Sequence, residues 1–178
     1  MTTTTQLMTA EELMQLQGPY RHELIKGELL TMSLPGAPHG AITVKLAVLL
    51  SIHVSANKLG IVFAETGFKL ESNPDTVLGP DVSFVSNVHV SSLREGYYPG
   101  LPDLAIEVHS PNDRRTAVER KTALWLSCGT KSVWLVDPRR RTVEVIRSSG
   151  ERKLLHESDE LIDDTVPGFH VPVSEIFN

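Results

Sequence analysis

The 178-residue sequence predicts an α/β protein of the mixed, α+β kind, in which helices flank a mixed β-sheet. Apolar residues recur at helical spacing over residues 39–56, which is typical of a long amphipathic helix. Short apolar runs bounded by turn residues, at 104–108 and 133–136, indicate buried strands. Because helical and strand segments are interspersed along the chain, the pattern excludes both an all-parallel sheet and a β-sandwich.

The N-terminal segment is predicted to form a short helix followed by a hairpin. Thr9 and Glu12 are spaced as in a capping box, so a helix is expected over residues 9–16. The apolar runs on both sides of Lys26 and Gly27 predict a tight antiparallel turn.

The middle of the chain is expected to be mostly strands. Residues 59–70 indicate a strand, a bend and a second strand, residues 73–79 a turn, and residues 81–85 a short strand. Residues 91–102 are expected to form a loop with a possible helical turn.

A second long helix is predicted to follow the 104–108 strand. Ser110 is expected to cap this helix, with Pro111 at its first position and Gly129 ending it. Residues 142–147 then predict another strand, and residues 166–177 an irregular tail with a final short turn.

Composition and charge narrow the classes of function. The chain has 17 Lys and Arg against 22 Asp and Glu, a net charge of −5 and a pI near 5.8. This excludes a generic basic nucleic-acid coat, whose pI is usually above about 9, but not an enzyme that binds nucleic acid through one local patch. The single cysteine, Cys128, excludes an internal disulfide and fits a cytoplasmic protein.

The chain is expected to be one domain over residues 1–178, with residues 1–6 as a disordered tail. No run approaches the roughly 18 apolar residues that a membrane helix requires, so no membrane partner is expected.

Two carboxylates stand out as candidates for chemistry. Asp81 follows Pro80 at the start of a strand, and Glu107 interrupts the apolar run 104–108. In a strand, Glu107 shares a face with Ala105 and His109. A buried carboxylate is costly without a cation, a proton or strong hydrogen-bond donors, so Glu107 is interpreted as either a salt-bridged group or a metal or catalytic ligand.

Lys121 is the natural neighbour for Glu107. At about 100° per residue, it lies near the centre of an apolar stripe on the second long helix. Either its stem reaches back to water or its ammonium meets an interior carboxylate. Because a strand and the helix that follows it usually pack together, the second arrangement is favoured. The stripe consists of Ala117, Lys121, Leu124, Trp125 and Cys128.

Glu23 and Glu28 flank the predicted hairpin and are either a further part of this site or solvated strand charges. His39 begins the first long helix, where a lone histidine is more often structural than a ligand. The seven histidines show no close ligand spacing, which argues against zinc, and no glycine-rich phosphate loop is present.

The order of Asp81, Glu107 and then a lysine on an α/β sheet is similar to the PD-(D/E)XK nuclease pattern. The chain more specifically resembles the Uma-type family of restriction endonucleases, over nearly its whole length. Pro102-Asp103 is a decoy, because it lies only four residues before Glu107 on the same strand, whereas Asp81 lies 26 before. The segments that carry the resemblance are 8–13, 20–28, 38–40, 65–68, 80–82, 102–108 with Ser110, Lys121, and 133–138.

The resemblance implies a restriction endonuclease-like fold and metal-dependent hydrolysis of phosphodiester bonds in nucleic acid, DNA in particular. It implies that Asp81 and Glu107 hold Mg²⁺ or Mn²⁺. The wider pattern has its lysine two residues after the acid, where this chain has His109, so the resemblance assigns that role to Lys121. Lys121 would orient the attacking water or, with a lowered pKa, act as the base, and Glu23 would complete the site.

Two other functions stay open: a weakly active or inactive nuclease-fold module that binds DNA or protein, and a hydrolase of a small phosphorylated or nucleotide substrate.

Further residues are expected to contribute around the acid–lysine site. A homodimer is expected, since two copies could pool their basic patches around one duplex. The accessory candidates are His39, Glu28, Glu65, His109 and Ser110. The nucleic-acid contact candidates are Arg114, Arg115 and Arg120, with a second basic group at 139–141, Arg147 and Arg152.

Overall fold

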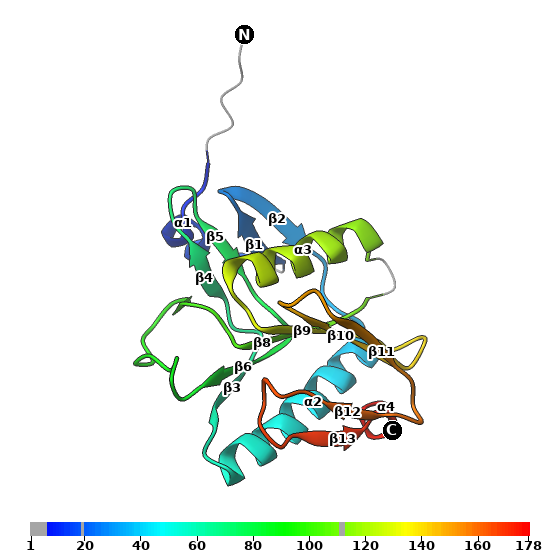
Figure 1. The fold of residues 1–178 in the computed structure, drawn as a ribbon. Coiled ribbons are helices and arrows are strands. Elements are labelled where there is room, and N and C mark those ends of the chain that lie inside the picture. Colours follow the sequence, from blue (N-terminus) through cyan, green and yellow to red (C-terminus); the bar gives the residue numbers. More distant parts are fainter. Residues whose placement is uncertain (1–6, 19, 111–112) are drawn as a thin grey trace.

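A computed structural model describes residues 7–18, 20–110 and 113–178. The predicted tail over residues 1–6 and Pro111 lie outside this part of the chain. The predicted fold class is confirmed, since helices flank mixed β-structure, but the strands divide between two larger sheets and one separate hairpin (Figure 1).

The larger sheet has six strands in the order β11-β10-β9-β8-β6-β3. Its central pair, β8 and β9, is parallel, and the other neighbouring pairs are antiparallel. The strands predicted at 81–85, 104–108, 133–136 and 142–147 all belong to this sheet. Its strands are β3 (Gly60–Ala64), β6 (Val82–Ser86), β8 (Leu104–Val108), β9 (Ser132–Asp137), β10 (Thr142–Arg147) and β11 (Arg152–Leu155).

The smaller sheet has five strands in the order β2-β1-β5-β4-β7. The predicted hairpin is confirmed, because β1 and β2 pair around Lys26 and Gly27, which both adopt positive φ. The turn predicted over 73–79 is wrong in part: Thr76–Leu78 forms β5, a fully buried strand between β1 and β4. The strands are β1 (Arg21–Ile25), β2 (Glu28–Met32), β4 (Phe68–Glu71), β5 (Thr76–Leu78) and β7 (Tyr98–Pro99).

The C-terminal tail is more regular than its sequence predicts. It contains the hairpin of β12 (Glu160–Ile162) and β13 (His170–Pro172), and the short helix α4 (Val173–Phe177). Packing decides this structure, because Leu161 and Val173 are fully buried in the main hydrophobic cluster.

The helices differ from the predicted ones mainly at their starts. The capping box of α1 (Ala10–Met14) is confirmed, since the side chains and backbones of Thr9 and Glu12 cap each other. The helix α3 (Arg115–Cys128) begins five residues after Ser110, whose backbone N–H instead donates to Asp113 Oδ2 at 2.7 Å. The predicted end at Gly129 is confirmed by its left-handed conformation.

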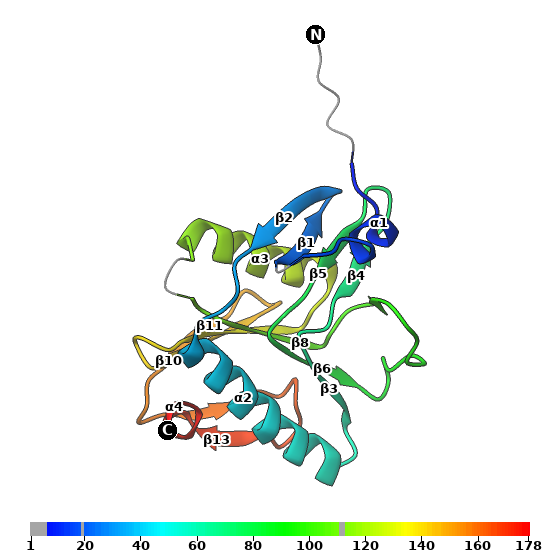
Figure 2. The same ribbon diagram turned by 180° about the vertical axis from the view of Figure 1, so that it is seen from behind.

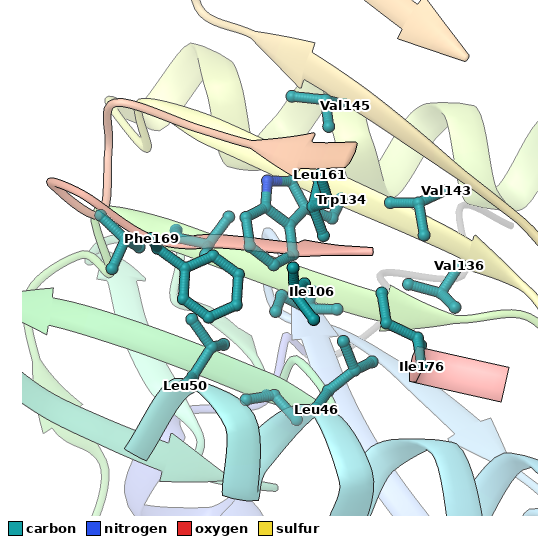
Figure 3. Close-up of a cluster of buried hydrophobic side chains, with 14 of the residues drawn as sticks. Leu46, Leu50, Ile106, Trp134, Val136, Val143, Val145, Leu161, Phe169 and Ile176 are labelled. Atoms are coloured by element: carbon teal, nitrogen blue, oxygen red, sulfur yellow. The ribbon is translucent and has the colours of Figure 1, made fainter. Parts of the chain in front are cut away.

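The six-stranded sheet separates two layers of packing (Figures 1 and 2). One face packs on α2 (Ala37–Ala56) and the β12–β13 hairpin, and the other faces α3 and the smaller sheet. In the first layer, the Trp134 ring stacks on Phe169 at a centroid distance of 5.8 Å, above Leu46 and Leu50 (Figure 3). The second layer contains Trp125, so α3 is fixed against the sheet near the end of β8.

The expectation that no segment has the length and apolarity of a membrane helix is wrong for α2. This 20-residue helix meets both criteria, with a mean hydropathy of 1.4 over its 18-residue window. Packing against the sheet accounts for only one side of α2, where Ile42, Leu46, Leu50 and Val54 are buried in the main cluster. The large apolar residues that are exposed on the helix are Val44, Val48 and Ile52.

Candidate active site

The ammonium of Lys121 lies between two buried carboxylates. Lys121 Nζ donates to Glu107 Oε2 at 2.9 Å, which confirms the predicted contact between α3 and β8. Trp125, one helical turn later, donates its Nε1–H to Glu107 Oε1 at 2.9 Å. Both Glu107 oxygens therefore accept a hydrogen bond from α3.

Glu23 brings the smaller sheet into the same site. Its Oε1 lies 2.8 Å from Lys121 Nζ and accepts the backbone N–H of Gly79 at 2.9 Å. Lys121 Nζ also donates to the carbonyl oxygen of Gly79 at 3.2 Å. Three acceptors thus surround an ammonium that has three protons, and they fix its position.

Asp81 lies beside this cluster on the neighbouring strand. The antiparallel pairing of Val82 with Ile106 continues backward, so Asp81 comes alongside Glu107. The Asp81 backbone N–H donates to the Ile106 carbonyl at 3.0 Å, and its side-chain Oδ2 accepts the Val108 N–H at 2.7 Å. The two acids, 26 residues apart in the chain, are therefore joined by the β6–β8 pairing.

Two basic side chains, His39 and Arg21, contact Asp81 from its other sides. His39 Nε2, near the start of α2, lies 3.2 Å from Asp81 Oδ2. Arg21 Nη1, on β1, lies 3.2 Å from Asp81 Oδ1 and 3.6 Å from Glu65 Oε1. The sequence reasoning missed Arg21, although its spacing of two residues from Glu23 puts both side chains on one face of the strand.

Burial and neighbouring carboxylates raise the pKa of Glu107. Removal from water is the largest cause, Asp81 and Glu23 add to it, and Lys121 opposes it, which leaves the pKa of Glu107 at about 7. Burial lowers the pKa of Lys121, but Glu107 and Glu23 outweigh it and raise that pKa. A neutral Lys121 acting as the base needs a lowered pKa, whereas its two carboxylate neighbours shift this pKa upward.

The pKa of Asp81 moves in the opposite direction. Burial raises it, but the hydrogen bonds from His39 and the Val108 N–H outweigh burial and lower it. The hydrogen bond to Asp81 in turn raises the pKa of His39, although burial opposes this. The two neighbouring acids therefore differ: hydrogen bonds favour the ionised form of Asp81, whereas burial favours the neutral form of Glu107.

Comparison with known families assigns the chain. The sequence model of the Uma2 family, described as "Putative restriction endonuclease", matches residues 10–174. The chain belongs to the Uma2 family. The match includes every residue of the Glu23, Asp81, Glu107 and Lys121 cluster.

A solved structure shows the same fold as this Uma2-family chain. It is a putative nuclease belonging to DUF820 from Anabaena variabilis ATCC 29413, with a TM-score of 0.81 and 23% sequence identity. The superposition covers 96% of this chain and 97% of that one. No curated protein matches the sequence significantly.

The donor chemistry of the site fits a hard divalent cation. Mg²⁺ commonly uses one or two carboxylates and fills its remaining positions with water and substrate oxygens. Asp81 and Glu107 supply two neighbouring carboxylates, and burial is the main reason that the pKa of Glu107 is raised. Residues 7–18, 20–110 and 113–178 hold no group of three or more His, Cys, Asp or Glu placed for a metal.

The other predicted accessory residues lie at or beyond the margin of the site. Glu65 contacts Arg21 with its side chain 53% exposed, and Glu28 is exposed on β2. His109 and Ser110 instead line a cavity next to the site. The buried Nε2 of His109 has no hydrogen-bond partner in the described residues.

The predicted basic patches divide in the same way. Arg114, the N-cap residue before α3, and Arg120, on α3, are exposed, and Arg115 lines the neighbouring cavity. Arg152 bridges Glu119 and Glu144, at 3.1 and 2.9 Å. Within the second basic group, therefore, only part of the positive charge is open to an anion.

Proposed function

We propose that this protein is a metal-dependent endonuclease that hydrolyses phosphodiester bonds in nucleic acid, with DNA as its substrate and Mg²⁺ or Mn²⁺ as its cofactor. One observation carries the proposal: Lys121 Nζ is held between Glu107 and Glu23, at 2.9 and 2.8 Å, next to Asp81. Membership of the Uma2 family supports it.

Asp81 and Glu107 would hold the metal ion. When bound, the ion supplies charge stabilisation to the phosphoryl oxygens and lowers the pKa of a bound water. Lys121, kept protonated by its two carboxylates, places a fixed positive charge where negative charge grows during phosphoryl transfer. Glu23 is a positioning residue, because its contact with this site is through Lys121 and Gly79.

His39 and Arg21 act on the reaction through Asp81. Their contacts at 3.2 Å fix the orientation of the Asp81 carboxylate and favour its ionised form. Because a cation near Asp81 also competes with a metal for that carboxylate, these two residues set how strongly the acid binds its ion.

Cleavage of supercoiled plasmid and labelled duplex tests this proposal, with Mg²⁺ or Mn²⁺ and with EDTA. Asp81→Asn, Glu107→Gln and Lys121→Ala are each expected to abolish metal-dependent cleavage while circular dichroism shows a folded chain. Glu95→Gln makes the same chemical change as Glu107→Gln on an exposed loop residue and is the matched control. Undiminished cleavage by purified Glu107→Gln would remove this mechanism.

A specific observation favours a second candidate, a nuclease-fold module without activity that binds DNA or protein. Every carboxylate oxygen of Asp81 and Glu107 already accepts a hydrogen bond from the protein. Calorimetric titration with Mg²⁺ and Mn²⁺ separates the two functions. Binding that Asp81→Asn removes supports the enzyme, and no binding to the wild type supports the module.

We also propose that the protein acts in the cytoplasm as a homodimer. The single cysteine suits a reducing compartment. The strand β2 lies at the edge of its sheet, and its Leu29 and Leu30 are 40% and 37% exposed. Soluble proteins usually protect such edges by charge, proline or a covering element, so pairing of β2 with a second copy would satisfy both its backbone and its leucines.

A further inference from the structure

A cavity of about 500 Å³ opens beside the acidic site, between α3 and the strands β8 to β11. Its wall is built where the two parallel strands end: His109 follows β8, and Arg139 follows β9. The carboxyl ends of parallel strands are a general place for ligands in α/β sheets. The cavity contains none of the residues Glu23, Asp81, Glu107 and Lys121 and is therefore separate from the acidic site.

The cavity nevertheless has wall residues close to Glu107. His109 follows Glu107 by two residues and shares its strand face, so the two side chains are spaced by about 7 Å along the chain. Leu135, also in the wall, pairs in register with Glu107. The cavity therefore lies within reach of a nucleic-acid strand whose reacting phosphate is at Asp81 and Glu107.

The acidic groups in the wall are already bound to the protein. Glu119 and Glu144 pair with Arg152 at 3.1 and 2.9 Å. Asp137 Oδ1 accepts two backbone N–H groups in the turn after β9, at 2.9 and 3.0 Å. Asp113 Oδ2 accepts the backbone N–H of Ser110 at 2.7 Å.

The arginine side chains in the wall, in contrast, form few contacts with other described residues. Within residues 7–18, 20–110 and 113–178, the guanidinium groups of Arg115 and Arg139 make no hydrogen bond or ion pair. Arg140 Nε approaches Asp137 only to 3.7 Å, and its side chain is 81% exposed. The wall therefore offers unused donors that are charged and forked, which suit the oxygens of a phosphate.

His109 also lines this wall, and its buried Nε2 has no hydrogen-bond partner in the described part of the chain.

We propose that this cavity binds a backbone phosphate of the nucleic-acid strand, close to the phosphate that reacts, through Arg115 and Arg139. This inference rests on the proposed nuclease function. In this arrangement the cavity positions the substrate, because the phosphate bound there determines which phosphodiester bond of the strand lies at Asp81 and Glu107.

Anisotropy titration of labelled oligonucleotides in EDTA tests the inference, because binding is then measured without cleavage. Arg115→Gln and Arg139→Gln are each expected to weaken binding by roughly three- to tenfold, for every sequence alike. The double variant is expected to reduce the slope of log K against log salt by about 0.7 to 0.9, because one phosphate contact is lost. Arg94→Gln removes the same charge from an exposed loop residue outside the cavity and is the matched control.

The outcomes separate this inference from the function on which it rests. Equal losses in the cavity variants and in Arg94→Gln, with an unchanged salt slope, overturn the cavity assignment and leave the nuclease proposal intact. No oligonucleotide binding by the wild type overturns both. A nucleoside monophosphate that competes as strongly as the oligonucleotide, and depends on the same arginines, would assign the cavity to a free nucleotide and overturn the strand placement.

Discussion

Replacing Asp103 by asparagine is expected to destabilise the fold while leaving the chemistry of the folded protein unchanged. Asp103 is 3% exposed and lies outside the Lys121 cluster. Its Oδ2 accepts the backbone N–H and the hydroxyl of Ser86, at 2.8 and 2.7 Å. Its Oδ1 lies 2.7 Å from Lys131 Nζ and 2.9 Å from His89 Nδ1. These donors bind the ionised carboxylate and tie β8 to the neighbouring turns.

The magnitude follows from the pKa of Asp103. Burial raises it, but Lys131, the Ser86 N–H and His89 outweigh burial and lower it from 3.8 to about 2. At about 1.4 kcal/mol for each pH unit, that difference is worth about 2 kcal/mol of unfolding free energy. Because the folded-state pKa is the lower one, this stability is present above pH 3.8 and is lost as the pH falls toward 2.

Urea denaturation followed by circular dichroism measures this effect. At pH 7, Asp103→Asn is expected to lose about 2 kcal/mol, which for a chain of this size lowers Tm by about 4–8 °C. The difference from wild type should shrink between pH 5 and pH 2.5. Asp164→Asn, with a side chain 92% exposed, is the matched control and should change stability by less than about 1 kcal/mol. A difference at pH 7 below 0.5 kcal/mol, or one unchanged at low pH, would refute the reasoning.

Three further changes test the packing and the assembly. Ile106→Ala removes a fully buried side chain from β8 and should cost about 2–5 kcal/mol in urea denaturation; a loss under 1 kcal/mol would contradict its place in the core. Gly129→Ala should cost about 1–2 kcal/mol by the same assay, because φ is +117° and the new Cβ would lie 3.1 Å from Leu101 Cδ1; a neutral result would argue against this end of α3. Leu30→Lys should convert the proposed dimer to monomer in light scattering with the circular dichroism spectrum unchanged, and a persistent dimer would exclude the β2 edge as the interface.

The local elements follow closely from the sequence. Features that depend on a few adjacent residues can be predicted from those residues alone. They include the capping box at Thr9, the turn at Gly27 and the left-handed end of α3 at Gly129. The start of α3 was predicted too early, because Ser110 offers a good cap pattern but its backbone binds Asp113 instead. The buried strand β5 was missed because its residues Thr76–Leu78 are too few to show a period.

Only some contacts of the candidate site could be predicted from the sequence. Glu107 and Lys121 were predictable as neighbours, since a charged residue in an apolar strand and a lysine on the next helix both need a partner within the same strand–helix unit. Arg21, and its contact with Asp81 at 3.2 Å, could not be predicted, because it depends on how the smaller sheet packs against the larger one.

The sequence by itself thus determined the element types, the family resemblance and the acid–lysine pair, because short-range spacing encodes all three. The sequence favoured Asp81 over Asp103 from spacing alone, and only the tertiary structure shows the contacts that separate these two Pro-Asp acids. The β6–β8 pairing sets Asp81 beside Glu107, whereas Asp103 is bound by Ser86, His89 and Lys131 at the other end of β8. Strand pairing joins residues that are distant in the chain, and it therefore gives two Pro-Asp dipeptides of identical sequence different surroundings.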